Sequence, residues 1–361
     1  MTSYLFVAHD ALGWRSYSRS IGAAFSDQGA QPTPIIRIGV DRWRRARYRW
    51  ARLSSRWGAF PDHVAINAAA VGRALASARA QYPADHVHFA DHAMAGPAEG
   101  LDASYSIALD VTGALRRRTP GFNQVSSGAI EREARLFKGA AALFPMSEWT
   151  AASLRDDYAV DERRILTIEP SPRDVAPGEP HPALDAFKPT KRLLFVGGDF
   201  ERKGGPELLE AARQLGDGVG LVIAGPPAER FAGTPGVLAL GPVDNDALRR
   251  RVMPFCHLLA LPSRKDMTPW VLAEANAAGL PSIVSNLAAL PGLTDYLEGT
   301  NVIVSVEPSA IAATAERLLR DETRRRHLGE AARARFERFQ NADKNAQRMR
   351  AFIEERRGES L

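Results

Sequence analysis

The feature that most restricts the fold of this chain is a repeated alternation of short apolar runs with longer helical segments. In the first half, the apolar runs at 4–10, 86–91, 105–111 and 141–145 are each followed by a loop or a helical segment. Such alternation is typical of a parallel sheet that is covered by helices on both faces. The alternation restarts at 191–198, where the chain reads KRLLFVGG, and continues through GLVIAG, VLALG, HLLALPS, SIVS and NVIVS. The sequence therefore predicts an α/β chain with two doubly wound parallel sheets.

A proline-rich segment, ILTIEPSPRDVAPGEPHPALDAFKPT, separates the two runs of alternation. Closely spaced prolines stiffen a chain into an extended spacer. We expect an N-terminal domain at 1–172, a linker at 173–190, a C-terminal domain at 191–338, and a last helix at 339–361 that packs back toward the N-terminal domain. Two domains of this kind bind their ligand in the cleft between them, outside the carboxyl ends of the strands.

Composition excludes several classes of protein. The single cysteine, Cys256, excludes an intramolecular disulfide bond and any metal site built from clustered cysteines. The first residues, MTSYLFVAHD, run straight into a strand and lack the pattern of a signal peptide. The chain also lacks an apolar run near the roughly 20 residues that span a bilayer. We expect a cytoplasmic protein, with peripheral attachment to the inner face of the membrane as an open alternative.

That alternative rests on a basic segment early in the chain. Seven arginines fall between Arg42 and Arg56. One apolar stripe runs through the same segment at steps of three and four residues, formed by Trp43, Ala46, Trp50, Leu53 and Trp57. Arg44, Arg45 and Arg49 could bind an anionic membrane or an anionic acceptor. The third interpretation is an amphipathic helix whose tryptophans pack on its own domain. Nucleic acid is disfavoured because no recognition motif accompanies the basic segment.

The segment SRKDMTPWVLAEANAAGLPSIVS, at 263–285, predicts a helix between two strands. Pro269 suits the first turn of a helix, and Thr268 offers a hydroxyl cap. The backbone N–H groups of Trp270 and Val271 would then lie at a helix N-terminus, where anions bind. Two acids, Asp266 and Glu274, stand eight residues apart and can reach different parts of one ligand. The alternative is a capped core helix with two solvated acids.

The segment FVGGDFERKGGPELLEA, at 195–211, predicts a second anion site. Gly197 and Gly198 end a strand and would let the backbone approach a phosphate closely. Arg202 and Lys203 supply positive charge over that position, and a helix follows. The alternative is a solvated basic turn. The phosphate interpretation gains support because this loop and the helix after 268 both leave carboxyl ends of strands in one domain.

These motifs together resemble a known family. FVGGDFERKGG, GPVDNDALRRRV, LLALPS and DMTPWVLAEANAAGLPSIVS resemble the GT-B retaining glycosyltransferases of the Glu-x7-Glu type, the group 1 or family 4-like enzymes. The C-terminal half matches densely, and the N-terminal half matches in layout and around SIALDVTGA and FPMSEWTAASL. The resemblance implies a GT-B fold, with two Rossmann-like doubly wound parallel-sheet domains facing across a cleft. It implies an acceptor-binding N-terminal domain, a nucleotide-sugar-binding C-terminal domain, and hexosyl transfer to an acceptor hydroxyl with retention.

The resemblance also implies roles for single residues. Arg202 and Lys203 would hold the donor diphosphate and stabilise it as it leaves. Glu274 would bind the ribose hydroxyls, and Asp266 would contact hydroxyls of the donor sugar. Gly13 falls where the family places a glycine of the first loop near the phosphates. Two departures stand out, because the first acid is Asp rather than Glu and because Pro269 replaces a common glycine.

A histidine beside the sugar is a further implication of the resemblance, and either His88 or His92 could be that residue. The donor would be a UDP-, GDP- or ADP-sugar, and the acceptor a saccharide, a lipid or a small molecule. No cofactor and no metal is expected, and the Asp-x-Asp at 244–246 is interpreted as a helix cap at Asn245 or Asp246. Two alternatives stay open: another GT-B activity, such as a nucleotide-sugar epimerase or hydrolase, and a binding subunit whose altered acid no longer supports transfer.

Overall fold

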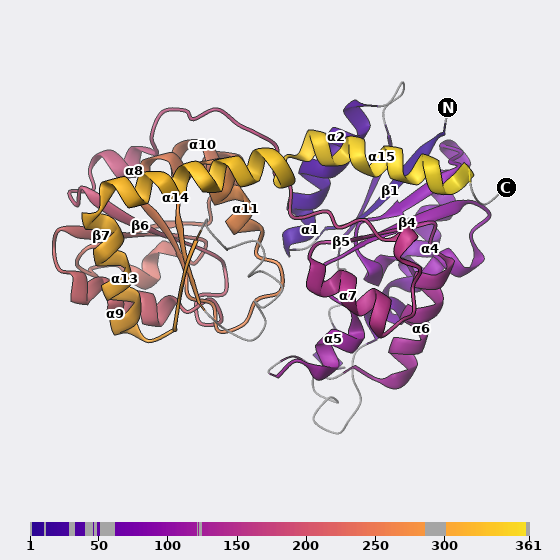
Figure 1. Cartoon of the computed structure of the whole chain (residues 1–361), viewed down its shortest axis with the longest axis horizontal. Helices are drawn as coiled ribbons and strands as arrows, with labels where there is room; N and C mark the ends of the chain where they lie inside the picture. The colour runs from indigo at the N-terminus through magenta and orange to yellow at the C-terminus, as the bar shows by residue number, and fades with distance from the viewer. Residues whose placement is uncertain are drawn as a thin grey trace. The chain divides into compact units, whose positions relative to one another are not determined.

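The computed structural model describes residues 2–10, 12–28, 33–39, 46, 49–50, 62–120, 122, 125–285 and 301–358. The chain divides into two compact units. Unit 1 consists of Met1–Arg173 together with Asn341–Leu361, and unit 2 consists of Asp174–Gln340. Figure 1 shows helices covering the sheet of each unit. Among the described residues, no helix combines the length and the apolarity that crossing a bilayer requires.

Unit 1 contains a parallel sheet of five strands in the order β2-β1-β3-β4-β5. The strands are β1 (Tyr4–His9), β2 (Ile35–Ile38), β3 (His86–Phe89), β4 (Ser104–Leu109) and β5 (Ala142–Pro145). The helices are α1 (Leu12–Tyr17), a π-helical turn (Ser18–Gly22), α2 (Ala23–Asp27), α4 (His63–Gln81), α5 (Gly113–Arg118), α6 (Ser127–Gly139), α7 (Glu148–Asp156) and α15 (Ala342–Gly358), with 3-10 turns at His92–Met94, Gly96–Gly100 and Glu162–Arg164. The apolar residues of β1 are fully buried, as a sheet covered on both faces requires.

Two elements of unit 1 differ from the sequence prediction. The sequence TGALRRRTPGF, at 112–122, predicts a basic loop, but its residues 113–118 form α5. Thr112 Oγ1 accepts a hydrogen bond from the Leu115 backbone N–H and caps this helix. The short edge strand β2 was not predicted. The last helix, α15, packs on α2 within the same unit, where the Arg350 guanidinium lies 4.1 Å from the centre of the Phe25 ring.

Unit 2 contains a parallel sheet of six strands in the order β11-β10-β9-β6-β7-β8. The strands are β6 (Lys191–Val196), β7 (Val219–Ala224), β8 (Val237–Gly241), β9 (Leu258–Leu261), β10 (Ser282–Ser285) and β11 (Asn301–Val304). The helices are α8 (Pro182–Asp185), α9 (Gly205–Leu215), α10 (Asn245–Arg251), α11 (Trp270–Ala277), α13 (Pro308–Arg320) and α14 (Glu322–Arg335), with 3-10 turns at Ala228–Phe231 and Met253–Phe255 and a π-helical turn at Phe336–Gln340.

Alternation along β6 places its side chains in two separate cores. Leu193 and Phe195 join the core under α9 and α13, whereas Leu194 faces the core under α10 and α11. Each face of the sheet therefore has its own buried core, as is typical of a doubly wound sheet.

The proline-rich segment belongs to unit 2 and is not a separate linker. Residues 182–185 form α8, and Leu184 is fully buried in the core under α10 and α11. Backbone hydrogen bonds from Gly178 N–H to Arg250 O at 2.9 Å and from His181 N–H to Arg251 O at 2.8 Å fix the segment to the end of α10. Prolines had suggested a spacer, but the burial of Leu184 and these hydrogen bonds hold the segment on the domain.

Candidate functional site

The topology of unit 2 creates a switch point between β6 and β9. From β6 the chain builds outward through β7 and β8, and from β9 it builds in the other direction through β10 and β11. The loops after two such neighbouring strands diverge and leave a crevice outside their carboxyl ends, which is where doubly wound sheets bind ligands. The loop after β6 carries Arg202 and Lys203, and the loop after β9 carries Asp266 and Thr268.

Two glycines shape the loop after β6. Gly197 has φ +155°, and a Cβ atom there would lie 2.3 Å from Lys203 Cδ, so the lysine side chain runs over the glycine. Gly204 has φ +74°, and a Cβ atom there would lie 1.9 Å from the carbonyl oxygen of Pro262. The two loops are joined directly by a hydrogen bond from Arg264 N–H to Arg202 O at 2.9 Å. Only glycine combines these backbone angles with such close approach.

The two predicted cations meet the first predicted acid. Lys203 Nζ lies 3.5 Å and Arg202 Nη1 lies 3.7 Å from Asp266 Oδ2. The Lys203 and Asp266 side chains are 15% and 13% exposed, so this ion pair is largely shielded from solvent. Arg202 is also held by Asp199 at 3.0 Å and donates to the Lys265 carbonyl oxygen at 2.6 Å. In this structure a carboxylate therefore occupies the position beside two cations that an anionic ligand group would share.

The start of α11 differs from the prediction. The helix begins at Trp270, with Pro269 as the N-cap residue rather than in the first turn, and no side chain caps it. Thr268 was expected to cap the helix, but its Oγ1 atom is buried and has no hydrogen-bond partner among the described residues. Burial without a partner is costly for a hydroxyl group. The start of α11 therefore offers a ligand an uncapped helix N-terminus and a buried hydroxyl group.

Glu274 is 4% exposed and lies inside α11, not on a solvated face. Burial raises the pKa of its carboxyl group, and three groups oppose that rise by favouring the ionised form. Asn245 Nδ2 donates a hydrogen bond to Glu274 Oε1 at 2.7 Å, and the charges of Arg249 and Lys203 act in the same direction. Sequence reasoning missed Asn245 and Arg249 as site residues. Their spacing of four residues, which places both on one face of α10, was the available signal.

The Asp-x-Asp segment caps a helix, as expected, but through its first residue. Asp244 Oδ1 accepts a hydrogen bond from the Asp246 backbone N–H at 2.9 Å, so Asp244 is the N-cap rather than Asn245 or Asp246. Asn245 is then free of the capping role and points to Glu274. Within the described ranges, no three His, Cys, Asp or Glu side chains gather in the way metal ligands do.

The predicted residues of unit 1 lie in different settings. His88 is fully buried in β3, where Ser106 Oγ and the Tyr17 hydroxyl group, both at 2.9 Å, hold its two ring nitrogens. Burial lowers the pKa of His88 to about 3, as expected for a neutral core histidine. His92 lies beyond the carboxyl end of β3, with Nε2 3.5 Å from Glu133 Oε1. Gly13 lies within α1 and not in a turn.

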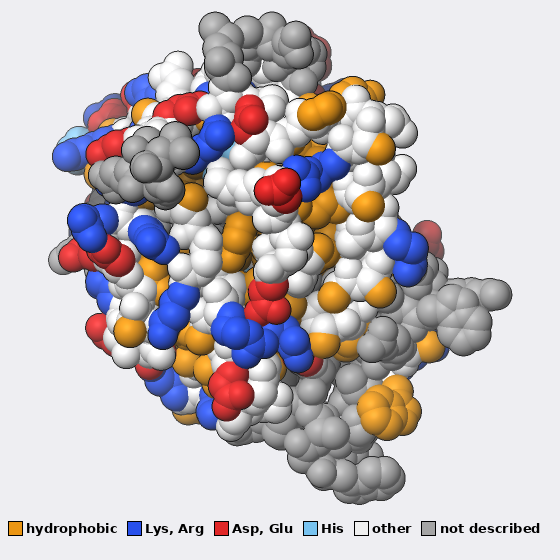
Figure 2. Space-filling view, turned by 90° about the vertical axis from the view of Figure 1, so that its right-hand side faces the viewer, with side chains coloured by type: hydrophobic (Ala, Val, Ile, Leu, Met, Phe, Trp, Pro, Cys, Tyr) orange, Lys and Arg blue, Asp and Glu red, His pale blue; other side chains and the backbone are white. Residues whose placement is uncertain are grey.

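The basic segment between Arg42 and Arg56 is described only in part. Trp43, Arg44 and Arg45 lie outside the described residues. Arg49 is exposed, and Trp50 is 69% exposed. On the face shown in Figure 2, the described basic side chains are interspersed with acidic ones.

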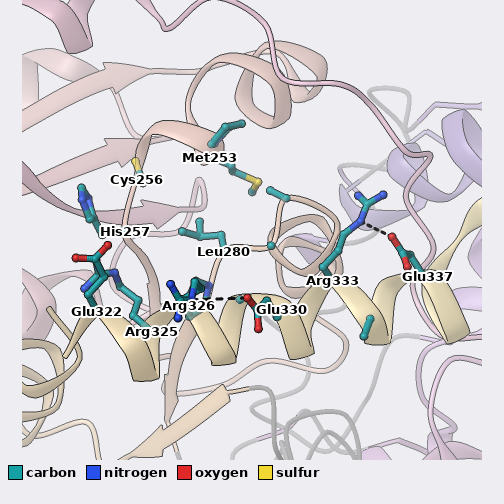
Figure 3. A pocket seen from close by; sticks show the side chains of 16 residues that line it. Met253, Cys256, His257, Leu280, Glu322, Arg325, Arg326, Glu330, Arg333 and Glu337 are labelled. Carbon is teal, nitrogen blue, oxygen red and sulfur yellow. Dashed lines mark hydrogen bonds and ion pairs between the residues drawn. The ribbon is translucent and has the colours of Figure 1, made fainter.

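Unit 2 also has a cavity of about 630 Å³ away from the switch point (Figure 3). Cys256 and His257, which precede β9, line it together with Leu280, which precedes β10, so the cavity lies at the amino ends of the strands. Burial raises the pKa of the Cys256 thiol to about 12, which disfavours the nucleophilic thiolate form. Charged side chains of α14 form the other wall, and Arg333 is paired there with Glu337.

Comparisons with known proteins agree with this fold. Residues 179–335 match the family model described as glycosyl transferases group 1. The chain is 27% identical over 213 residues to the D-inositol 3-phosphate glycosyltransferase of Segniliparus rotundus. That match covers 52% of this chain and 46% of the relative, so the chain spans about half the length of the curated relative it matches.

Two solved structures are similar over almost the whole chain. Sucrose-phosphate synthase from Thermosynechococcus elongatus is 17% identical, with a TM-score of 0.74 and coverage of 98% of this chain and 99% of that one. Anabaena Alr3699/HepE in complex with UDP and glucose is 12% identical, with a TM-score of 0.70 and coverage of 98% and 100%. At such low identity, these structural similarities establish the fold alone. The chain has the GT-B fold, and its residues 179–335 match the family model of the glycosyl transferases group 1.

Proposed function

We propose that this protein is a glycosyltransferase that moves a hexosyl group from a nucleotide-diphosphate sugar to an acceptor hydroxyl group. The observation that carries the proposal is the convergence of Arg202, Lys203 and the uncapped start of α11 at the switch point of unit 2. This region lies within the segment that matches the group 1 family. The UDP and glucose in the Anabaena Alr3699/HepE complex support a nucleotide-sugar donor.

In this proposal each side chain acts on a separate part of the donor. Lys203 and Arg202 bind the diphosphate and stabilise the negative charge that develops on it as it leaves. Thr268 Oγ1, which lacks a partner among the described residues, donates to the donor diphosphate or sugar. Glu274 accepts hydrogen bonds from the ribose hydroxyl groups. Asp266 exchanges part of its contact with Lys203 for a contact with the sugar.

We further propose that transfer proceeds with retention and without a metal ion. The bond between the anomeric carbon and the diphosphate oxygen breaks, and its electron pair leaves with the diphosphate. The acceptor oxygen bonds to the same face of the anomeric carbon, and its proton passes to the departing diphosphate. Two side-chain cations and a helix N-terminus supply the charge stabilisation for which other enzymes use a divalent ion.

The donor is identified by a thermal-shift screen of UDP-, GDP- and ADP-sugars, because excess ligand stabilises the native state. Lys203→Ala should abolish most of the shift and reduce transfer by roughly 100-fold or more. Arg213→Ala on the exposed face of α9 is the matched control. Unchanged transfer by Lys203→Ala refutes the proposed site.

Product analysis separates the competing activities. Comparing products with and without acceptor distinguishes transfer from hydrolysis or epimerisation, and the anomeric configuration reports retention. Turnover that survives excess EDTA supports metal independence. Donor binding without any turnover would favour the alternative of a binding subunit.

We also propose that the basic segment attaches the protein to the cytoplasmic face of an anionic membrane. The 69% exposure of Trp50, beside the exposed Arg49, supports this attachment. Co-sedimentation with liposomes containing anionic lipid should be lost when Arg44, Arg45 and Arg49 are replaced by Glu. Retention unchanged by these substitutions contradicts the attachment.

A further inference from the structure

Unit 1 has a switch point of its own. The chain passes from β1 to β2 on one side, and from β3 through β4 to β5 on the other, so β1 and β3 are the neighbours between which the direction changes. Ligands bind outside the carboxyl ends of such a pair of strands. His9 ends β1, and Asp91 stands two residues beyond the Val7–Phe89 pair that closes the β1–β3 ladder. Parallel register therefore brings His9 and Asp91 together at this switch point.

Asp91 fixes the ring of His9. His9 Nδ1 lies 2.9 Å from Asp91 Oδ2, while Asp91 Oδ1 accepts a hydrogen bond from the Ala93 backbone N–H at 2.9 Å. Asp91 is 5% exposed, and this burial by itself raises the pKa of its carboxyl group. The hydrogen bond from His9 and the charge of the nearby His92 act in the opposite direction and outweigh burial, so the pKa of Asp91 is lowered. An ionised carboxylate only accepts hydrogen bonds, so the proton of this contact belongs to His9 Nδ1.

In the neutral form of the imidazole, which carries one N–H group and one lone pair, the other ring nitrogen of His9 is then an acceptor. His9 Nε2 is buried and has no hydrogen-bond partner among the described residues. The neighbouring core histidines differ in this respect. In His86 the hydroxyl groups of Ser104 and Ser106 engage both nitrogens, at 2.7 and 2.8 Å. A histidine at a switch point that has a partner at one ring nitrogen and none among the described residues at the other can accept a hydrogen bond from a ligand.

We propose that His9 Nε2 accepts a hydrogen bond from a hydroxyl group of a saccharide or polyol acceptor. The inference rests on the proposed transferase function and names one contact of its acceptor site. The hydroxyl group bound by His9 is not the reacting one, whose proton passes to the departing diphosphate. Asp91 is the positioning residue, because it sets the tautomer that makes Nε2 an acceptor.

The tautomer is tested directly by nitrogen-15 NMR of the full chain labelled at histidine, with His9→Gln used to assign the signals. We expect Nδ1 of His9 to have the chemical shift of a protonated nitrogen and Nε2 that of an unprotonated one. Addition of glycerol, myo-inositol or glucose should shift the Nε2 resonance with at least one of the three. A protonated Nε2, or a resonance that none of the three polyols moves, overturns the proposal.

Two variants separate a ligand contact from a structural role. In His9→Asn the amide nitrogen can still donate to Asp91, but no acceptor remains at the position of Nε2. We expect the KM for the acceptor to rise about tenfold or more, with the KM for the donor unchanged, and His9→Gln to restore part of the loss. Asp91→Asn should reverse the tautomer, since its amide group donates to Nδ1. Equal acceptor KM values in His9→Asn and the wild type overturn the proposal.

Failure of the proposed function gives a different result. It would appear as a missing donor-dependent thermal shift in the wild type, while the NMR experiment on His9 would still report its tautomer and its response to polyols. Retention of the wild-type donor shift in His9→Asn shows that unit 2 remains intact in the variant.

Discussion

Asn245→Ala removes one hydrogen bond from the buried Glu274 carboxylate and leaves the start of α10 capped, because the cap is Asp244. A hydrogen bond to a charged group contributes about 1.5–3 kcal/mol. The bond from Asn245 also lowers the pKa of Glu274 against the effect of burial, so its loss raises that pKa further. If Glu274 binds ribose as an ionised acceptor, donor affinity should fall roughly 10- to 100-fold.

The expected loss depends on pH. A carboxyl group whose pKa is raised becomes protonated at a higher pH, so the protonated fraction of Glu274 grows as the pH falls. The donor identified by the thermal-shift screen is then used for isothermal titration calorimetry. The ratio of the dissociation constant of Asn245→Ala to that of the wild type should be larger at pH 6 than at pH 8. Asp246→Ala, an exposed substitution in the same turn, is the control. Equal affinities of Asn245→Ala and the wild type at pH 6, or an equal loss in Asp246→Ala, would refute the assignment.

Three further predictions test the structure. Gly204→Ala and Gly216→Ala both place alanine at φ near +74°, but only at Gly204 does the new Cβ meet a backbone oxygen, at 1.9 Å. Denaturant unfolding should therefore show a loss of stability of roughly 1–2 kcal/mol for Gly216→Ala and of roughly 3 kcal/mol or more for Gly204→Ala. Because the pKa of His88 is lowered to about 3, the unfolding free energy should fall by on the order of 5 kcal/mol as pH drops from about 6.5 toward 3, and His88→Asn should show a shallower pH dependence. In Gly197→Ala the new Cβ displaces the Lys203 side chain, so turnover should match that of Lys203→Ala. The double variant should lose little further turnover, and additive losses of turnover would contradict the contact between the two residues.

The parts of unit 2 that could be predicted from sequence are those in which backbone geometry depends on local residue type. Gly197 and Gly204, beside Arg202 and Lys203, have backbone angles and close contacts that other residues do not tolerate, so the loop after β6 could be located from the sequence. The β–α alternation could be recognised for the same reason, because its period depends on neighbouring residues.

The residues that sequence reasoning missed depend on tertiary packing. Asn245 and Glu274 lie on different helices and are 29 positions apart in the chain. The four-residue spacing of Asn245 and Arg249 could suggest a shared helix face, but it could not identify Glu274 as the partner. Thr268 illustrates the opposite error. Its position before a helix predicted a cap, but the helix begins two residues later and the hydroxyl group stays unpaired among the described residues. In the proposed site, a ligand would complete the hydrogen bonding of this hydroxyl group.

One topological rule locates the proposed ligand contacts in both units. In each sheet the chain changes direction between two neighbouring strands, and an aspartate after one strand holds a basic side chain from the other. In unit 2 Asp266 holds Lys203, and in unit 1 Asp91 holds His9. The partners differ in what they offer to a ligand. Lysine is a cation with three donors and suits a phosphate, whereas an imidazole held at Nδ1 offers a lone pair and suits a hydroxyl group. The proposed transfer from a diphosphate donor to a hydroxyl acceptor would use both contacts.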